Sequence, residues 1–185
     1  MTKTEFVKKS LSVFFVMALF IRLSAFASEL FFLPQDSEQA LSTILKSIDS
    51  SKKSIKITIY NFTHKKIANR LKTAAKRGVR VEIIFDAKSA SRDRRRSMFY
   101  YLAKYKNISV YKLKGKLIKK QNRYAIMHLK SALFDHKRVI FGSANWTYSA
   151  FGKNYEMLYV DDDYAKAKRF DKYFDELKKL SRPFK

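Results

Sequence analysis

The chain has 185 residues, enough for one domain with a buried core, and 40 lysines and arginines against 16 acidic residues give it a formal net charge of +24. A charge of this size attracts polyanions such as nucleic acid or an anionic membrane surface, although a generally basic composition is the simpler alternative. The lack of cysteine excludes disulfides, thiolate metal sites and a cysteine nucleophile.

Residues 1–27 have the layout of a secretory signal peptide. Lysines precede an apolar run, and Ala25 and Ala27 then form a small-residue cleavage site. Arg22 leaves the apolar run short for a membrane span, so a cleaved signal peptide and a retained N-terminal membrane anchor both stay open. In either case we expect residues 28–185 to act as one domain in the periplasm or on the outer face of a bacterial membrane.

Strands and helices alternate along these residues, which predicts an α/β domain with a mixed, partly parallel sheet flanked by helices. The expected elements are, in chain order, a strand at 28–34, a helix capped by Asp36, a strand at 54–62 with one buried face, a helix from the cap Thr63 to Gly78, a strand at 79–86, a helix at 87–106, a strand at 108–113, a mobile basic loop at 112–123, strands at 125–134, 137–144 and 156–160, and a helix from about Asp161 to Leu180.

One stretch combines residue types that suit phosphate chemistry. Strand alternation places His128 and Lys130 on one face, where an imidazole can attack phosphorus and an ammonium group can neutralise a phosphate oxygen. A glycine, a serine and an amide end the following strand, where their donors can hold further oxygens. Together these positions form the pattern H-x-K-(x)4-D-(x)6-G-S-x-N, filled by His128, Lys130, Asp135, Gly142, Ser143 and Asn145.

The pattern resembles that of the phospholipase D superfamily, in particular its small single-motif bacterial nucleases of the Nuc and NucT types. The N-x-E element of these nucleases is also present, as Asn154 and Glu156. The resemblance implies that His128 is a nucleophile that forms a phosphohistidine, and that the histidine of a second motif protonates the leaving oxygen and then activates water. It implies no metal and no cofactor. For the remaining site residues it implies that Lys130 and Asn145 bind phosphate oxygens, Ser143 supports the same pocket, Glu156 accepts the other N–H of the imidazole, and Asp135 belongs to the site mainly by bracing the hairpin.

A complete site of this family needs two motifs, and the sequence holds one. His64 and Lys66 repeat only the H-x-K element, because position 71 is leucine where an aspartate is required. We therefore expect a homodimer in which two His128 residues face each other. His64 itself and His136 are expected to have ordinary structural roles, and the acidic run after residue 160 is expected to begin a helix and not to bind a cation.

Basic and aromatic residues outside the motif suggest a nucleic-acid track. Arginines around residue 94 and lysines near residue 118 would bind phosphates, although a solvated helix face is the simpler interpretation of the arginines. Bases of a single strand stack on aromatic rings, and the ring next to the motif is the preferred candidate. The predicted substrate contacts are Trp146, Arg92, Arg94, Arg95, Arg96, Lys116, Lys119, Lys120 and Arg123.

Three functions remain open from the sequence. We favour a metal-independent endonuclease that prefers single-stranded DNA, with RNA as a further substrate, because many phosphates can use the large positive charge. The alternative is a phospholipase D-type lipid phosphodiesterase, which would need an exposed apolar rim that the sequence does not reveal. The last is a nucleic-acid-binding module without catalysis, which would not require an intact nucleophile.

Overall fold

The structure is a computed structural model that describes residues 28–89 and 94–184. The predicted signal peptide or anchor lies outside these residues, and so does Arg92. None of the helices in the described part is both long and apolar enough to cross a membrane.

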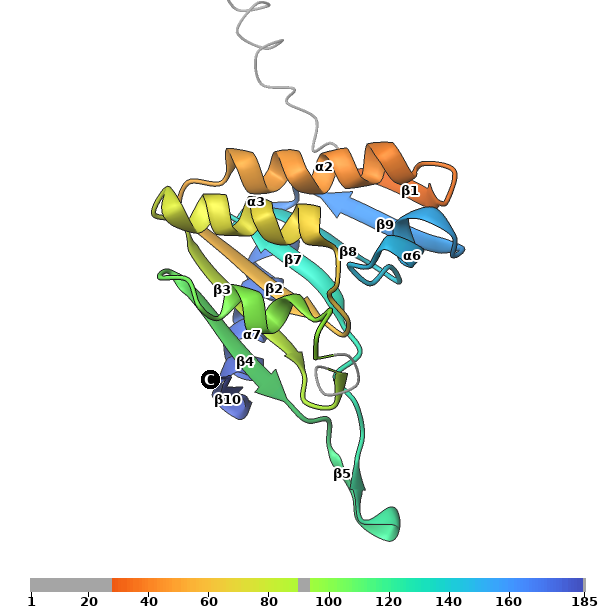
Figure 1. The fold of residues 1–185 in the computed structure, drawn as a ribbon, viewed down its shortest axis with the longest axis vertical. Coiled ribbons are helices and arrows are strands. Elements are labelled where there is room, and N and C mark those ends of the chain that lie inside the picture. The colour runs from red at the N-terminus through yellow and green to blue at the C-terminus, as the bar shows by residue number, and fades with distance from the viewer. Residues whose placement is uncertain (1–27, 90–93, 185) are drawn as a thin grey trace, which may run out of the picture.

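One mixed sheet of eight strands organises the domain, as the alternation of elements predicted (Figure 1). Its strand order is β1-β9-β8-β7-β2-β3-β4-β10; β2, β3 and β4 run parallel, and the other pairs are antiparallel. The strands are β1 (Glu29–Leu33), β2 (Ser54–Ile59), β3 (Arg80–Asp86), β4 (Ile108–Leu113), β7 (Lys130–Phe134), β8 (Arg138–Gly142), β9 (Glu156–Asp161) and β10 (Arg182–Pro183).

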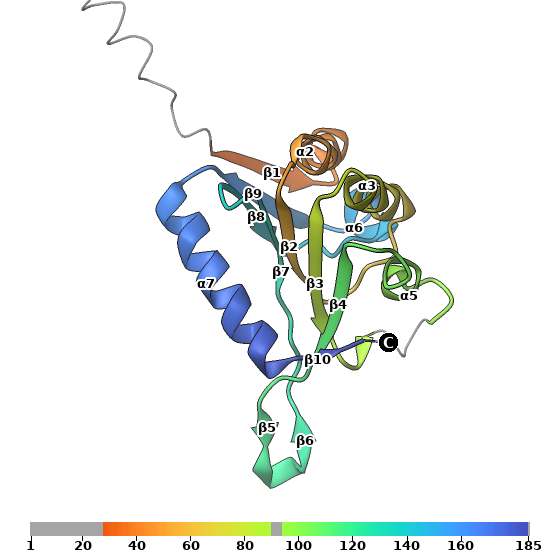
Figure 2. The ribbon, with the colours of Figure 1, turned by 90° about the vertical axis from the view of Figure 1, so that its left-hand side faces the viewer.

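Helices cover both faces of the sheet. One face carries α2 (Ser37–Ser50), α3 (Lys65–Lys76), α5 (Met98–Leu102) and α6 (Tyr148–Gly152), and the other carries α7 (Tyr164–Leu180) (Figure 2). The main core lies between the sheet and the first group of helices and includes the isoleucines of β2.

Strand β2 is buried on both faces, so the prediction of a single buried face was wrong. Its polar face lies under α7, where the Lys56 ammonium bonds to Asp171 and Asp175, both at 2.6 Å. Burial alone would lower the pKa of Lys56, but these two carboxylates raise it above its ordinary value. Lys56 on β2 is therefore paired with carboxylates of α7 and is not exposed to solvent.

Two further predicted elements differ from the structure. Of the helix predicted at 87–106, residues 90–93 lie outside the described residues. In the described residues from 94 to 106 the helix is confined to α5, Met98–Leu102, because Ser97 is extended and the Met98 N–H bonds to the Phe62 carbonyl. The predicted basic loop is an ordered hairpin of β5 (Leu117–Ile118) and β6 (Arg123–Tyr124), joined by a short 3-10 turn, Lys119–Gln121, and it extends away from the body of the domain (Figures 1 and 2).

Candidate active site

The first motif residues lie where β2 ends and β7 begins. Lys130 opens β7 opposite Ile59, and His128 precedes the strand, which is shorter than the predicted 125–134. The backbone there is held by a side chain and not by a neighbouring strand, since the Met127 N–H donates to the Asp86 carboxylate at 2.9 Å. His128 is exposed at this edge.

Lys130 and Tyr60 position the His128 segment. The Lys130 side chain is 8% exposed, and its ammonium donates to the His128 carbonyl at 2.9 Å. The Tyr60 ring meets the imidazole edge to face at 4.8 Å and lies 5.6 Å from the Lys130 ammonium. Sequence reasoning missed Tyr60 and Asp86, although Tyr60 directly follows β2 and Asp86 ends the parallel strand β3. The carboxyl ends of parallel strands are where open α/β sheets commonly form sites.

The environment favours the neutral imidazole. His128 is exposed as a residue, but partial loss of hydration lowers the pKa of its imidazole, the Lys130 charge lowers it further, and Asp86 opposes both in part. Burial also lowers the pKa of Lys130, against the opposing charge of Glu156. An unprotonated imidazole has a lone pair for attack on phosphorus, so His128 suits the role of nucleophile near neutral pH.

Asn145 and Ser143 follow the end of β8 close to its neighbour β9. The Asn145 Oδ1 accepts from the Asn61 N–H at 3.0 Å, which leaves the amide NH2 as the donor end. The Ser143 hydroxyl donates to Glu156 and accepts from the Met157 N–H at 3.1 Å. Gly142 is required beside them, since a Cβ there would lie 2.1 Å from the Met157 carbonyl oxygen.

Glu156 does not make the predicted contact with His128 within this chain. Its carboxylate accepts from Ser143 and, at 3.3 Å, from the Asn154 amide. It therefore orients the Ser143 hydroxyl and contributes negative charge near Lys130.

Asp135 lies at the far end of β7, away from His128, and braces the hairpin as expected. It adopts a positive φ of 50°, and its carboxylate accepts from the backbone N–H groups of Lys52, Lys53 and Ser54 at 2.8, 2.8 and 2.9 Å. Burial would raise the pKa of Asp135, but these three bonds outweigh it and lower the pKa. The neighbouring His136 bonds to Ser54 and Asp171, which is also a structural role.

We expect Asp135→Ala to lower the free energy of unfolding by about 2–4 kcal/mol, because three backbone donors lose a charged acceptor. Asp135→Asn should cost less, since asparagine keeps one oxygen and tolerates a positive φ. The stabilisation should be present above pH 3.8, the ordinary pKa, and should be lost as the pH falls through the lowered value. Urea unfolding at several pH values measures this. A large fall in the specific activity of the folded fraction would instead assign Asp135 a direct catalytic role.

A hollow of about 820 Å³ opens beside His128 and Lys130, between the β7–β8 hairpin and α7. The hollow is lined by basic side chains of α7 and by aromatic side chains of α7 and β8. Sequence reasoning did not select these residues. They are Phe141, Phe170, Tyr173, Lys166, Arg169 and Lys172. Aromatic rings can stack on the bases of a single-stranded nucleic acid, and cations next to them can bind its phosphates.

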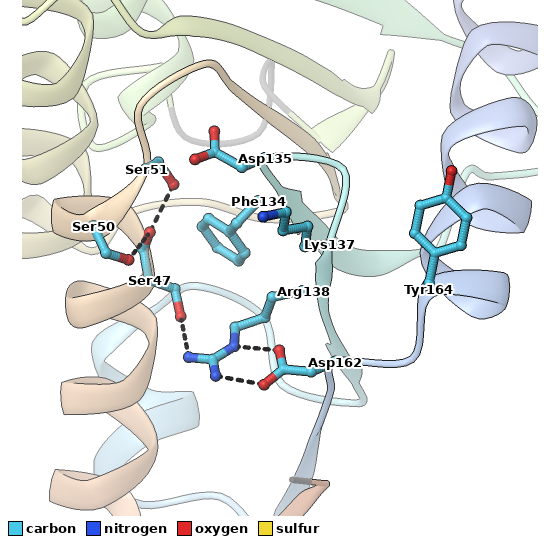
Figure 3. Close-up of a pocket in the computed structure, with 9 residues that line it drawn as sticks. All are labelled: Ser47, Ser50, Ser51, Phe134, Asp135, Lys137, Arg138, Asp162 and Tyr164. Atoms are coloured by element: carbon cyan, nitrogen blue, oxygen red, sulfur yellow. Dashed lines mark hydrogen bonds and ion pairs between the residues drawn. The ribbon is translucent and has the colours of Figure 1, made fainter. Parts of the chain in front are cut away.

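A different hollow, of about 500 Å³, lies at the Asp135 end of the hairpin (Figure 3). Its one guanidinium, from Arg138, is bound by both oxygens of Asp162 at 2.7 Å (Figure 3). This bidentate pair joins β8 to the start of α7. The hollow is therefore best explained by packing and not by catalysis.

Trp146 is not a substrate contact in this structure, contrary to prediction. Its side chain is 2% exposed and packs edge to face against Phe62 at 5.2 Å. Its carbonyl accepts from the N–H groups of Thr63 and His64. These contacts join the motif loop to the segment that follows β2. The Trp146 ring is buried there and is not available to stack on a base of a single-stranded nucleic acid.

The predicted basic track is divided between two elements. Arg94, Arg95 and Arg96 lie in the turn before α5, and not on a helix as expected. The other predicted contacts, Lys116, Lys119, Lys120 and Arg123, lie on or beside the β5–β6 hairpin. Exposed Leu117, Tyr124 and Ile126 accompany them.

His64 has the structural role expected of it. It is buried, stacks on Tyr148 at 4.3 Å and meets Phe151 edge to face. Burial lowers its pKa. After residue 160, Asp163 caps α7 by accepting from the Lys166 N–H, and the described residues contain no group of three or more His, Cys, Asp or Glu side chains placed to hold a metal ion.

Comparison with known proteins agrees with this geometry. The family model described as "Cardiolipin synthase, PLD-like domain" matches residues 44–178. NucT from Helicobacter pylori has a similar structure, with a TM-score of 0.83 and 40% identity over 86% of this chain and 99% of that one. Nuc from Salmonella typhimurium, described as a phospholipase D family member, has a TM-score of 0.71 and 27% identity over 86% of this chain and 98% of its own.

Curated relatives include mitochondrial cardiolipin hydrolases. The mitochondrial cardiolipin hydrolase of Xenopus laevis is 27% identical over 141 residues, which are 76% of this chain and 62% of the relative. The corresponding protein of Mus musculus is 25% identical over 59% of its length. This chain thus spans about three fifths of these relatives.

Proposed function

The chain belongs to the phospholipase D-like domain family, and from that premise we propose that it is a phosphodiester hydrolase that cleaves single-stranded DNA. The observation that carries the choice is the hollow beside His128 and Lys130, whose lining combines basic side chains of α7 with aromatic rings. Such a lining fits phosphates and bases better than acyl chains. The similarity to NucT over nearly its whole length supports the same choice. We extend the proposal to RNA, since none of these features distinguishes the two sugars.

The proposed reaction has two steps at His128. The neutral imidazole attacks phosphorus, an N–P bond forms, the P–O bond to the leaving group breaks, and a second histidine gives its proton to that oxygen. Water then attacks the phosphohistidine, loses a proton to the second histidine, and releases His128. Lys130 and Asn145 would hold the non-bridging oxygens in both steps.

We propose that the second histidine is His128 of another copy of the chain. His64 cannot serve within one chain, because it is buried against Tyr148. An exposed apolar patch beside the site supports association. It consists of Leu30, Phe32, Phe141 and Met157, which are between 42% and 53% exposed and lie on neighbouring strands β1, β9 and β8 on the sheet face that carries α7.

The same patch supplies the apolar rim that the sequence did not reveal, and it keeps a lipid phosphodiesterase as the second candidate function. The similarity to cardiolipin hydrolases favours that candidate too. We assign the patch to a second copy, because a site with one motif is incomplete without a partner. The proposed location is the periplasm or the outer face of a bacterial membrane, with residues 1–27 as signal or anchor, and it rests on the sequence alone.

One assay separates the candidates. We expect the full chain to cleave labelled single-stranded DNA in excess chelator, with activity falling steeply as salt rises, and His128→Ala to form no product. Duplex DNA, RNA and vesicles that contain cardiolipin are tested in parallel. Lipid turnover without DNA cleavage would establish the second candidate function, and tight DNA binding by both proteins without products would mean a binding module.

A further inference from the structure

A basic hollow of about 400 Å³ is lined by residues of α3, of α5 and of the turn before α5. Both helices lie on the sheet face opposite α7 (Figure 2). Among the described residues that line it, four carry cations and none is acidic; the cations belong to Lys65, Arg94, Arg95 and Lys104. A neighbouring hollow of about 580 Å³ shares three of them. Four like charges gathered at one hollow create a positive potential that attracts an anion.

Ser97 adds a hydrogen-bonding group that points to the same kind of ligand. The residue lines the hollow and is 7% exposed, yet its hydroxyl has no hydrogen-bond partner among the described residues. It precedes α5 without capping that helix through its side chain. Buried hydroxyls are normally paired, so an oxygen of a bound ligand would complete this one.

Neighbouring groups hold Arg94 in place and add to the positive potential of the hollow. The Arg94 guanidinium lies over the Tyr100 ring, 5.1 Å from its centroid, and Tyr100 packs edge to face on Phe184 at 4.8 Å. Lys65 opens α3, whose first turn contains no acidic residue. The positive end of that helix dipole therefore adds to the attraction for an anion.

The backbone links this hollow to the catalytic centre. The Met98 N–H, at the wall of the hollow, bonds to the Phe62 carbonyl. The preceding residue, Asn61, bonds to the motif amide of Asn145. The hollow therefore lies near the phosphate-binding amide, on the other face of the sheet from the hollow beside α7. A single-stranded nucleic acid bound at His128 could therefore continue past Asn145 and reach the hollow between α3 and α5.

We propose that the hollow between α3 and α5 binds a backbone phosphate of the substrate strand, several nucleotides from the phosphate that is cleaved. The proposal rests on the proposed nuclease function and extends it, since it predicts that long single strands are bound better than short ones. Arg94 and Arg95 would bind the phosphate oxygens, and the Ser97 hydroxyl would donate a hydrogen bond to one of them.

The test uses the full chain and labelled single strands of about 30 and about four nucleotides. We expect Arg94→Ala/Arg95→Ala to weaken binding of the long strand ~10-fold and to make the slope of log affinity against log salt shallower by about 0.7 for each phosphate that the protein no longer neutralises. The preference for the long strand in kcat/KM should fall in parallel. Arg80→Ala, an exposed arginine at the start of β3, is the control for removal of a positive charge.

Ser97→Ala distinguishes ligand binding from a structural role. It removes an unpaired hydroxyl, so thermal unfolding should occur at the same or a higher temperature while affinity for the long strand falls. If Arg94→Ala/Arg95→Ala binds the long single strand with the same affinity as Arg80→Ala, the proposal is overturned even if the wild type cleaves DNA. A wild type that cleaves no nucleic acid would overturn the nuclease function itself, and loss of binding to cardiolipin vesicles alone would reassign the hollow to a lipid headgroup.

Discussion

In mixtures of wild-type and His128→Ala chains, DNA cleavage should fall as the square of the wild-type fraction. The reason is that a site built from two copies needs both histidines, one as nucleophile and one as acid. An equimolar mixture should retain about one quarter of the activity, against about one half for independent sites. The pure variant should lose at least about 10⁴-fold in kcat. The measurement is initial rate against mixing ratio after co-refolding.

His136→Ala is the matched control, because this histidine lies at the opposite end of β7 and bonds to Ser54 and Asp171. It should leave the mixing curve of the wild type unchanged. Phe32→Glu/Met157→Glu places charges in the apolar patch and should give inactive monomers on sedimentation. A linear mixing curve, or a monomer that still turns over, would contradict the shared site.

Lys130→Met should lower kcat by about 10²–10³-fold, because the ammonium no longer stabilises charge on the phosphate oxygens. The change should also move the acid limb of the pH profile. Burial and the Lys130 charge both lower the pKa of His128, so the wild-type acid limb should lie below pH 6.5. Removing that charge raises the pKa of His128, and activity should then begin to fall at a higher pH.

The measurement is kcat/KM for a single-stranded substrate from about pH 4.5 to 8. Lys137→Met, in the exposed turn of the same hairpin, is the control for removal of one positive charge. An unchanged acid limb in Lys130→Met would show that Lys130 does not influence the imidazole. A decrease of less than about tenfold in kcat would show that Lys130 does not stabilise the transition state.

Local patterns were enough to predict the class of fold and the motif. The pattern of apolar residues predicted the order of β1, α2, β2, α3, β3, β4, β7, β8, β9 and α7, whereas α5 is much shorter than the predicted helix and α6 and β10 were not predicted. The spacing of His128, Lys130, Ser143 and Asn145 identified the family that the comparisons confirm. The sequence is enough for such predictions, because the period of the apolar residues and the spacing of the motif residues depend only on residues close together along the chain.

The sequence by itself therefore determined the α/β sheet, the family motif and its single occurrence. Only the tertiary structure decided which polar groups meet: Lys56 under α7, Tyr60 against His128, Trp146 buried beside Phe62, and Ser97 among the arginines. Periodicity shows which face of an element is apolar, but contacts between residues far apart in sequence depend on how strands pair and which helix covers them. The ring of Trp146 and the charge of Lys56 looked exposed for that reason, and packing buried both.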